Sequence, residues 1–375
     1  MDPSAPNATS AARAVGGLAL IVPCHDEAAV VERRLANLLA CAWPDGPARI
    51  VVVDDHSGDG TLERARAFAA ARAGDRPAID LVANDREPGK TSALAAGLAR
   101  IAALPLDERP DLVGMTDADV VLANDALVRV AAAFADPRLG LACGAQHFVA
   151  RLADDGSPPP VGAPDAGGRY DRITAAVRRL ESRAGRLFSV HGQLAVWRRA
   201  LDLAPTIGVA ADDVDLMAQV RVAGYRTQLV EGATFFETKP AAAPDREGQA
   251  RRRAAAWFDA LDAAAARSRA AGAPAPLGPG LLDRAQWRVY AAAPLACARL
   301  AAPLGVALVA VGLVAVQRTS GTPAALASLG LVLLLLWFAR GPLRDWLALA
   351  RIIRAARKEG RRTLGAGDRW EMARR

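Results

Sequence analysis

Short apolar runs alternate with segments of helical periodicity over the first 120 residues, and this alternation limits the possible folds more than any other feature. The runs are rich in Val, Ile and Leu, and they cover 18–23, 49–53, 79–83 and 112–116. The segments between them repeat apolar residues three or four positions apart, over 27–41, 61–73 and 90–103. Strand and helix in this order predict βαβ units, so we expect an α/β fold with a doubly wound sheet.

Polar residues follow these predicted strands at the points where the strands end. Asp54 and Asp55 follow the second strand, and Lys90 opens the helix after the third. Asp117 and Asp119 follow the fourth. Because ligands of doubly wound sheets bind at the carboxyl ends of the strands, the sequence predicts one site at one edge of the sheet.

Asp117 and Asp119 lie two positions apart just beyond an apolar strand. Alternate residues of an extended chain share a direction, so both carboxylates can approach one oxygen-seeking cation. Such a cation can bridge the phosphates of a nucleotide and neutralise a departing diphosphate. The same tripeptide is also common in solvated turns, and only its place at a strand end favours a metal site.

The polar residues nearer the N-terminus allow more than one interpretation. Asp54 and Asp55 suit a turn, and they equally suit hydrogen bonds from a base or a ribose. The segment Gly89-Lys90-Thr91 is not a phosphate loop, because Asn84 stands where the first glycine of that motif belongs. Lys90 at a helix start can still meet a phosphate with its charge and with the free N–H groups beside it.

A second acidic cluster contains Asp212 and Asp213 at the predicted start of a later helix. Acidic residues at a helix start are favoured by the helix dipole, so capping is one interpretation. The other is that one carboxylate acts as a general base toward an acceptor hydroxyl. The turn His191-Gly192-Gln193 follows a strand-like segment, and its glycine either lets the backbone approach a substrate or forms a bend.

In their order and spacing, these motifs resemble glycosyltransferase family 2, whose members have the GT-A fold. The matching pieces lie within residues 18–260: Ile21-Val22-Pro23-Cys24-His25-Asp26-Glu27, Val51-Val52-Val53-Asp54-Asp55-His56-Ser57-Gly58-Asp59-Gly60-Thr61, Gly89-Lys90, Thr116-Asp117-Ala118-Asp119, and Asp212-Asp213 before Asp215. The resemblance implies a GT-A domain with a mixed sheet, and an enzyme that transfers a sugar from a nucleotide-sugar.

The resemblance also implies roles for individual residues. Those expected to contact the nucleotide-sugar are Pro23, Glu27, Asp54, Asp55, Lys90 and Asp117. Asp119 is the expected main ligand of a divalent metal, Mn²⁺ or Mg²⁺, with Asp117 beside it. Asp213 is the expected general base, and Asp212 replaces the Glu that is usual at its position. The acceptor is expected to lie against His191, Gly192 and Gln193.

Residues 249–253 partly match Gln-x-x-Arg-Trp, a motif of relatives that extend polymers. Gln249 and an arginine are present, but the tryptophan is missing and the next one is Trp257. This departure argues against processive polymer synthesis. Gln249, Arg252 and Arg253 are still predicted to contact the acceptor, because arginines suit diphosphate or lipid phosphate groups.

Two uncharged apolar runs, Leu300–Val316 and Thr322–Ala339, lie toward the C-terminus. About 20 apolar residues span a bilayer, so a transmembrane hairpin is expected, with two buried core helices as the alternative. Basic residues concentrate in the tail that follows, and the positive-inside rule then places both ends of the hairpin in the cytoplasm. Since residues 1–17 show no signal-peptide pattern, the expected location is the cytoplasmic membrane with a cytoplasmic catalytic domain.

The predicted organisation has five parts. They are a disordered N-terminus (1–17), the catalytic domain (18–260), a linker with interfacial helices (261–299), two transmembrane helices (300–339) and a basic cytoplasmic tail (340–375). Within the catalytic domain, residues 18–120 form the expected nucleotide-binding half and 121–260 the acceptor half. Residues 151–169 are rich in Pro, Gly and Asp and are expected to form a flexible loop, followed by a basic helix over 172–188.

The function predicted from these features is inverting transfer of a sugar from a UDP-sugar, or another nucleotide-sugar, to a lipid-linked or saccharide acceptor at the membrane. Transfer onto a polyprenyl phosphate is an alternative, since that anionic acceptor needs no strong base. A non-catalytic GT-A-like membrane subunit is another. The net charge of +7 suits an anionic membrane or a phosphate-bearing substrate, and no nucleic-acid-binding motif is present.

Overall fold

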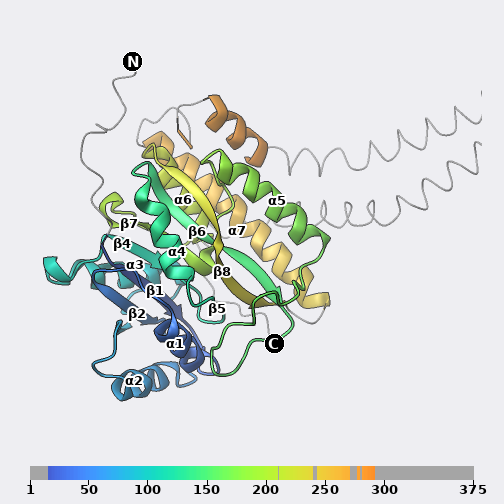
Figure 1. Ribbon diagram of the computed structural model, residues 1–375. Coiled ribbons are helices and arrows are strands. Elements are labelled where there is room, and N and C mark those ends of the chain that lie inside the picture. Colours follow the sequence, from blue (N-terminus) through green and yellow to red (C-terminus); the bar gives the residue numbers. More distant parts are fainter. Residues whose placement is uncertain (1–15, 210, 240–242, 271–276, 279–280, 292–375) are drawn as a thin grey trace, which may run out of the picture.

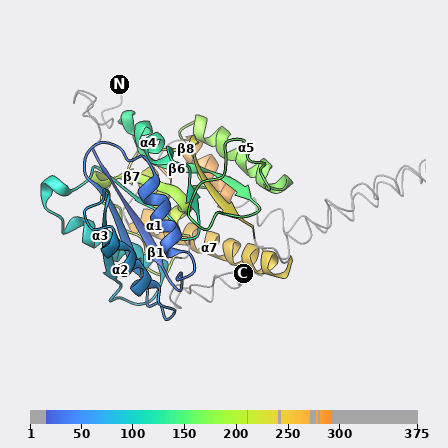
Figure 2. The same ribbon diagram turned by 60° about the horizontal axis from the view of Figure 1, so that its bottom comes forward.

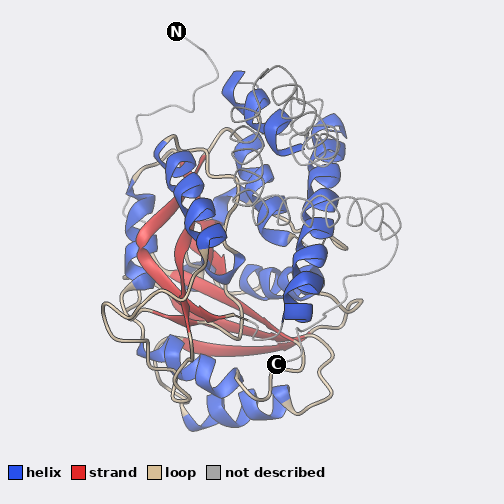
Figure 3. Cartoon of the chain, turned by 90° about the vertical axis from the view of Figure 1, so that its right-hand side faces the viewer, coloured by secondary structure: helices blue, strands red, loops and turns tan. Residues whose placement is uncertain are grey.

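Eight strands within the described residues form one sheet in the order β3-β2-β1-β4-β7-β6-β8-β5 (Figure 1). The computed structural model describes residues 16–209, 211–239, 243–270, 277–278 and 281–291. Helices lie on both faces of the sheet (Figure 3). The alternation of apolar runs and helical segments therefore predicted the α/β class correctly.

The N-terminal half of the sheet is parallel. Its strands are β1 (Leu18–Cys24), β2 (Ala48–Asp54), β3 (Ala78–Ala83) and β4 (Leu112–Met115), and β1 lies between β2 and β4. The intervening helices are α1 (Val31–Ala40), α2 (Thr61–Ala71) and α3 (Lys90–Ala102). Each element lies close to the segment that the sequence predicted for it.

The C-terminal half makes the sheet mixed. Strand β7 (Ala195–Arg198) is antiparallel to β4 and to β6 (Leu139–Val149). Strand β8 (Arg226–Thr238) is parallel to β6, and β5 (Val121–Leu122) is antiparallel to β8. The helices of this half are α4 (Ala126–Ala132), α5 (Arg169–Arg183), α6 (Asp212–Val222) and α7 (Ala243–Ala270). The basic helix expected over 172–188 corresponds to α5.

The central strand β1 is buried on both of its faces, which explains its continuous apolar sequence. Successive side chains of a strand point to opposite faces. Ile21 accordingly belongs to the core on the side of α3, with Leu94, whereas Leu20 belongs to the core on the side of α1, with Leu35. The two cores pack α1 and α3 against β1, and the carboxyl end of β1 borders the predicted site.

The loop before α5, expected to be flexible, has no regular helix or strand between residues 151 and 168. It is nevertheless attached to the fold. Leu152 is buried, and Asn37 of α1 donates a hydrogen bond from Nδ2 to the carbonyl of Gly156 at 3.0 Å. The absence of periodicity in the sequence predicted the irregular backbone, whereas the attachment depends on a side chain more than 100 residues away.

The predicted transmembrane hairpin (300–339) and basic tail (340–375) lie outside the described residues, as does most of the predicted N-terminal segment. Among the residues that the structure describes, no helix has both the length and the apolar character needed to cross a membrane.

A last described helix, over residues 281–291, contacts α5, the segment directly after α5, and α6. The rings of Tyr290 and Phe188 stack with centroids 4.0 Å apart, and the Tyr290 hydroxyl donates to Glu181 of α5 at 2.6 Å. Asp283 pairs with both Arg186 and Arg221. This helix is therefore fixed to the sheet domain beside α5.

The close contact between α3 and β1 generates a prediction about Gly97. A Cβ atom at this position would lie 2.6 Å from Cγ2 of Ile21, so we expect Gly97→Ala to lower the free energy of unfolding by about 1–2 kcal/mol. Alanine's helix propensity, worth about 1 kcal/mol, opposes this loss without cancelling it. Thermal unfolding of the purified chain measures the change.

Gly58→Ala is the matched control, because no atom lies within 4 Å of a Cβ placed there. In an Ile21→Ala background, the Gly97 substitution should become neutral or stabilising. Equal destabilisation in both backgrounds would show that the contact with Ile21 is not the cause.

Candidate active site

The parallel strands bring the predicted polar clusters to one edge of the sheet. Cys24 at the end of β1 is in register with Asp54 at the end of β2, and Ile21 is in register with Met115 at the end of β4. The turn 116–119 follows β4 directly. The strand-end positions inferred from the sequence therefore do converge.

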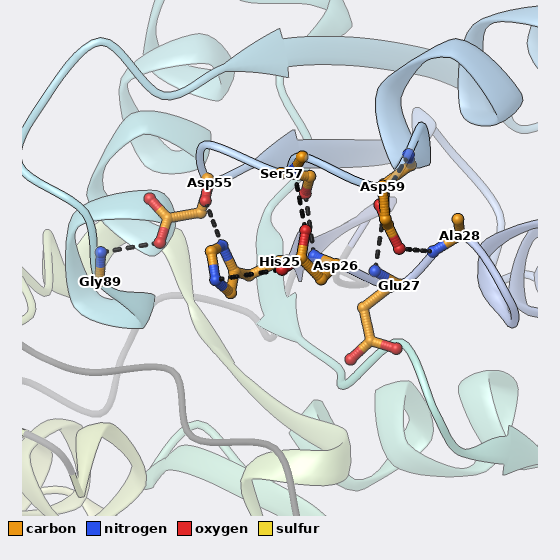
Figure 4. A network of polar contacts seen from close by, with 10 residues as sticks. His25, Asp26, Glu27, Ala28, Asp55, Ser57, Asp59 and Gly89 are labelled. Carbon is orange, nitrogen blue, oxygen red and sulfur yellow. Dashed lines mark hydrogen bonds and ion pairs between the residues drawn. The ribbon is translucent and has the colours of Figure 1, made fainter. Parts of the chain in front are cut away.

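The loops after β1 and β2 are bonded to one another (Figure 4). Asp26 accepts a hydrogen bond from the backbone N–H of Gly58 at 2.8 Å, and its own N–H donates to the Ser57 hydroxyl at 3.0 Å. Asp59 accepts from the N–H groups of Ala28 at 2.9 Å and Thr61 at 3.0 Å. Partial burial disfavours the charge of Asp59, but these hydrogen bonds prevail and lower its pKa. Asp26 and Asp59 thus serve to join the two loops.

Asp54 and Asp55, predicted together, have different surroundings. Asp55 is fully buried and accepts a hydrogen bond from Asn84 Nδ2 at 2.6 Å. It also accepts one from the Gly89 N–H at 2.7 Å (Figure 4). It therefore fixes the loop that leads into Lys90. Asp54 is also buried, but its Oδ1 accepts no hydrogen bond from the described residues. A buried acceptor of this kind suits a hydrogen bond from a ligand.

Lys90 connects the nucleotide-binding half predicted from the sequence to helix α6. Its Nζ lies 2.8 Å from Oδ1 of Asp117 and 3.4 Å from Oδ2 of Asp212. Burial opposes the positive charge of Lys90, but the two carboxylates outweigh it and raise the pKa of Lys90 above its usual value. A lysine held in this way stays charged and can neutralise phosphate oxygens.

The two aspartates of the metal motif lie in a turn rather than at the end of a strand, because β4 ends at Met115. Ala118 is buried between Asp117 and Asp119, and both aspartates are partly exposed. The carboxylates thus remain accessible from outside the core, with the residue between them buried.

The described residues contain no group of three or more His, Cys, Asp or Glu side chains placed to hold a metal ion. Asp117 and Asp119 supply hard oxygen donors, which suit Mn²⁺ or Mg²⁺ when ligand oxygens and water complete the coordination shell. The residues present therefore fit a metal shared with a phosphate ligand better than one held by protein alone.

Asp212 and Asp213 form the first turn of α6. Burial raises the pKa of Asp213 to about 7, and the neighbouring charge of Asp212 adds to this effect. Burial also raises the pKa of Asp212, against the influence of Lys90. A Cβ on Gly192 would lie 3.7 Å from Oδ2 of Asp213, so the His-Gly-Gln turn passes beside this carboxylate.

The other aspartate of the cluster, Asp215, has a structural role. It is fully buried and accepts hydrogen bonds from the backbone N–H of Thr206 at 2.9 Å and from Gln219 Nε2 at 3.2 Å. It also pairs with Arg267 of α7 at 2.9 Å. Asp215 therefore joins α6 to the preceding loop and to α7.

The predicted acceptor residues lie in two places, the turn 191–193 and helix α7. The buried ring of His191 packs edge-on against Phe235 of β8, with centroids 5.3 Å apart. The backbone carbonyl of Gln193 accepts a hydrogen bond from the Thr116 hydroxyl at 2.6 Å. Three further candidates lie on α7, but their side chains fall outside the described residues: Gln249, Arg252 and Arg253.

The predicted nucleotide contacts Pro23 and Glu27 lie at the same edge. Pro23 is buried in β1, in register with Val53 of β2. The Glu27 backbone N–H donates to the Thr61 hydroxyl at 2.8 Å. Its carboxylate points away from the bonds that join the two loops (Figure 4). Thr61 thus holds the Glu27 backbone while the side chain extends elsewhere.

Sequence reasoning missed Arg34 of α1, which lies fully buried beneath the turn 116–119. Its Nη1 donates to the carbonyl of Val120 at 3.1 Å, and its Nη2 donates to the hydroxyl of Thr116. Burial lowers the pKa of Arg34 to about 10, while the charges of Asp117 and Asp119 act in the opposite direction. The guanidinium is therefore charged at neutral pH and serves as a buried counter-ion for the acidic turn.

Asn37 lies one helical turn beyond Arg34 and binds the chain just after the acidic turn, at Leu122. Its Oδ1 accepts from Nη1 of Arg34 at 2.8 Å and from the N–H of Leu122 at 2.8 Å. Its Nδ2 donates to the Leu122 carbonyl at 3.0 Å. The available sequence signal was two polar residues on the apolar face of a predicted helix: Arg34 directly before Leu35, and Asn37 directly before Leu38.

An α/β sheet that gathers a charged lysine and several carboxylates at one edge is typical of enzymes that bind nucleotide diphosphates. Residues 16–260 match a family model described as "Glycosyltransferase like family 2", and the chain belongs to this family. Family membership confirms the predicted glycosyltransferase class.

Among curated relatives, an N-acetylglucosaminyltransferase of Rhizobium sp. (strain N33) is 26% identical over 256 residues, which cover 64% of this chain and 51% of the relative. A poly-beta-1,6-N-acetyl-D-glucosamine synthase of Staphylococcus epidermidis is 24% identical over 187 residues, covering 50% of this chain and 40% of the relative. The chain thus matches about half, or less, of the length of these relatives.

Among solved structures, a mannosyltransferase from Pyrobaculum calidifontis in complex with GDP-Man and Mn²⁺ is similar to this chain. Its TM-score is 0.60 at 25% identity, and the similarity covers 92% of this chain and 86% of that one. The likeness agrees with the mixed α/β sheet described above.

The buried position of Arg34 predicts that it stabilises the acidic turn. Arg34→Met would leave Val120 and Thr116 without their donor and remove the counter-ion beneath two carboxylates. We expect a loss of about 3 kcal/mol in the free energy of unfolding, measured by thermal unfolding. Arg64→Met is the control: Arg64 is exposed and lies 3.6 Å from Glu32, so its loss should change stability by less than about 0.5 kcal/mol. Equal effects of the two substitutions would contradict the prediction.

Proposed function

We propose that this chain is an inverting glycosyltransferase in which Asp213 removes the proton from the acceptor hydroxyl. The observation that carries the proposal is a carboxylate at the active edge, beside Gly192, whose pKa burial raises to about 7. A pKa near the working pH suits a general base. The acceptor oxygen then attacks the anomeric carbon, the bond to the diphosphate breaks, and the configuration at that carbon inverts.

We propose the role of each donor-side residue from its burial, hydrogen bonds and charge contacts. Asp54 offers a buried oxygen to the base or ribose, and Lys90 offers its charge to the diphosphate. Asp55, with its carboxylate bonded to Asn84 and Gly89, positions the loop before Lys90. Pro23, Glu27 and Asp117 complete the proposed nucleotide contacts.

A divalent metal, Mn²⁺ or Mg²⁺, is proposed to bind at Asp119 with Asp117 beside it. When bound, it would supply positive charge to the departing diphosphate. Arg34 beneath the turn fixes the backbone on both sides of the two aspartates, through Thr116 and Val120. The structural neighbour that contains GDP-Man and Mn²⁺ supports this assignment.

The proposed donor is a nucleotide-sugar, with a UDP-sugar as the first candidate to test. The proposed acceptor is lipid-linked or a saccharide at the cytoplasmic face of the membrane. The apolar runs within 300–339 support the membrane location. Gln249, Arg252, Arg253 and the turn 191–193 are proposed to contact the acceptor.

The proposed base predicts how activity depends on pH. Because Asp213 must be unprotonated to accept a proton, kcat/KM should fall as the pH drops below about 7, by about tenfold per unit. Asp213→Asn should lower kcat by roughly 10²–10⁴-fold and abolish this limb of the profile. Radiolabelled nucleotide-sugars offered to membranes containing the enzyme measure both effects.

Asp107→Asn is the matched control, since Asp107 is exposed in the short turn Leu106–Glu108 and should leave the profile unchanged. An Asp213→Asn enzyme with full activity on a polyprenyl phosphate would favour an anionic acceptor that needs no base. Full activity on a hydroxyl acceptor would refute the assignment.

The proposed metal site predicts that nucleotide binding depends on Asp119. Calorimetry with UDP and Mn²⁺ should show binding that is at least about tenfold weaker in Asp119→Asn than in the unchanged chain. EDTA should remove this difference. Asp125→Asn, which changes a carboxylate paired with Arg129 at 2.6 Å outside the turn, should bind UDP normally. UDP binding of equal strength with Mn²⁺ and with EDTA would contradict the metal assignment.

A further inference from the structure

Helix α5 exposes a row of large apolar side chains. Tyr170 is 72% exposed, Ile173 54%, Val177 43% and Leu180 69%, and no residue of the helix is fully buried. At about 100° per residue, these four positions fall within an arc of about 80°. We call this row the α5 stripe. A contiguous row of exposed apolar side chains is unfavourable in water and marks a surface that contacts another molecule.

The opposite face of α5 is the one attached to the protein. Arg178 donates to the carbonyl of Ser189 at 3.1 Å, and the Ser182 hydroxyl donates to the carbonyl of Leu229 in β8 at 3.2 Å. These contacts fix the direction in which the helix faces. The α5 stripe therefore points away from the protein, because the opposite face of the helix is bonded to it.

A row of arginines borders the α5 stripe. Arg169, Arg172 and Arg183 are exposed and form no ion pair within the described part of the chain. Arg179 lies in the same row and pairs with Glu231 at 2.9 Å. An apolar arc next to a basic arc is the pattern of a helix that lies in the plane of a membrane interface.

We propose that α5 lies in the headgroup region of an anionic lipid membrane, with the α5 stripe toward the acyl chains and the arginine row on lipid phosphates. This inference rests on the membrane location proposed above and assigns it a surface of the catalytic domain. Basic residues near an anionic leaflet attract its phosphates, so the charge of the row matches this occupant.

The neighbouring helix over residues 281–291 extends the same surface. Gln286 donates to Glu181 of α5 at 2.8 Å, and the outer side of this helix exposes Leu281 by 75%, Leu282 by 63% and Val289 by 59%. Figures 1 and 2 both show α5 on the opposite side of the molecule from α2. The two helices together present apolar side chains away from the nucleotide-binding half.

A second copy of the chain fits this surface less well. A two-fold contact brings the same surface of both copies together, so the unpaired arginines of both rows would be brought into one interface. Like charges near an interface oppose association, whereas anionic headgroups neutralise them. The charge of the surface thus favours lipid over a copy of the same chain.

The experiment places an environment-sensitive fluorophore on the α5 stripe of the full-length chain. Val177→Cys is labelled in a background of Cys297→Ser, where Cys24, Cys41 and Cys143 are buried. Ala70→Cys on the exposed side of α2 is the matched control. Both proteins are reconstituted into vesicles of phosphatidylcholine, with and without phosphatidylglycerol, and quenching by brominated lipid is measured.

We expect a blue-shifted emission and several-fold stronger quenching at position 177 than at position 70, increased by phosphatidylglycerol. Replacing Arg169, Arg172 and Arg183 by Gln should reduce the quenching at position 177. Equal, weak quenching at both positions in protein that floats with the vesicles would refute the role of α5 but leave the membrane location intact. A blue shift without lipid quenching would refute it as well, by showing that protein covers the stripe.

Discussion

The geometry of the active edge depends on one buried charge, the guanidinium of Arg34. A cation without exposure to water is costly, and here hydrogen bonds to Thr116 and Val120 together with the charges of Asp117 and Asp119 offset that cost. The acidic turn consequently has a fixed backbone while its carboxylates stay partly exposed. The hydrogen bonds of Arg34 on either side of the two aspartates hold this backbone without any ligand.

From this turn, a series of charge contacts crosses the sheet edge. Asp55 holds Gly89, which places Lys90 at the start of α3, and Lys90 contacts both Asp117 and Asp212. One lysine thus forms ion pairs with carboxylates from both halves of the domain. A negatively charged diphosphate near Lys90 would compete with Asp117 and Asp212 for its charge. The proposed donor site and the proposed base are therefore coupled electrostatically through the side chain of Lys90.

The sequence predicted the parts of this arrangement that depend on local pattern. Buried runs located the four parallel strands, and the strand ends located Asp54, Asp117 and Lys90. It did not reveal Arg34 as a partner of the turn, because its contact with Thr116 joins residues 82 positions apart. The α5 stripe was also missed, since periodicity predicts an amphipathic helix but only tertiary packing determines which face is turned outward. The strand predicted over 112–116 ends one residue earlier, at Met115, and the acidic residues beyond it lie in a turn.

The direction of each pKa shift separates the aspartates that stabilise the fold from those suited to chemistry. Hydrogen bonds lower the pKa of Asp59 despite partial burial, so its ionised form favours the folded state above the ordinary aspartate pKa, and this contribution is lost in acid. Asp213 behaves oppositely: burial raises its pKa to about 7, so the folded chain binds its proton more tightly than the unfolded chain does. Stability contributed by this proton is present at low pH and is lost as the pH rises from about 4 to about 7. A fold that keeps such a carboxylate gives up stability at neutral pH, and that loss is explained if Asp213 is retained to accept a proton.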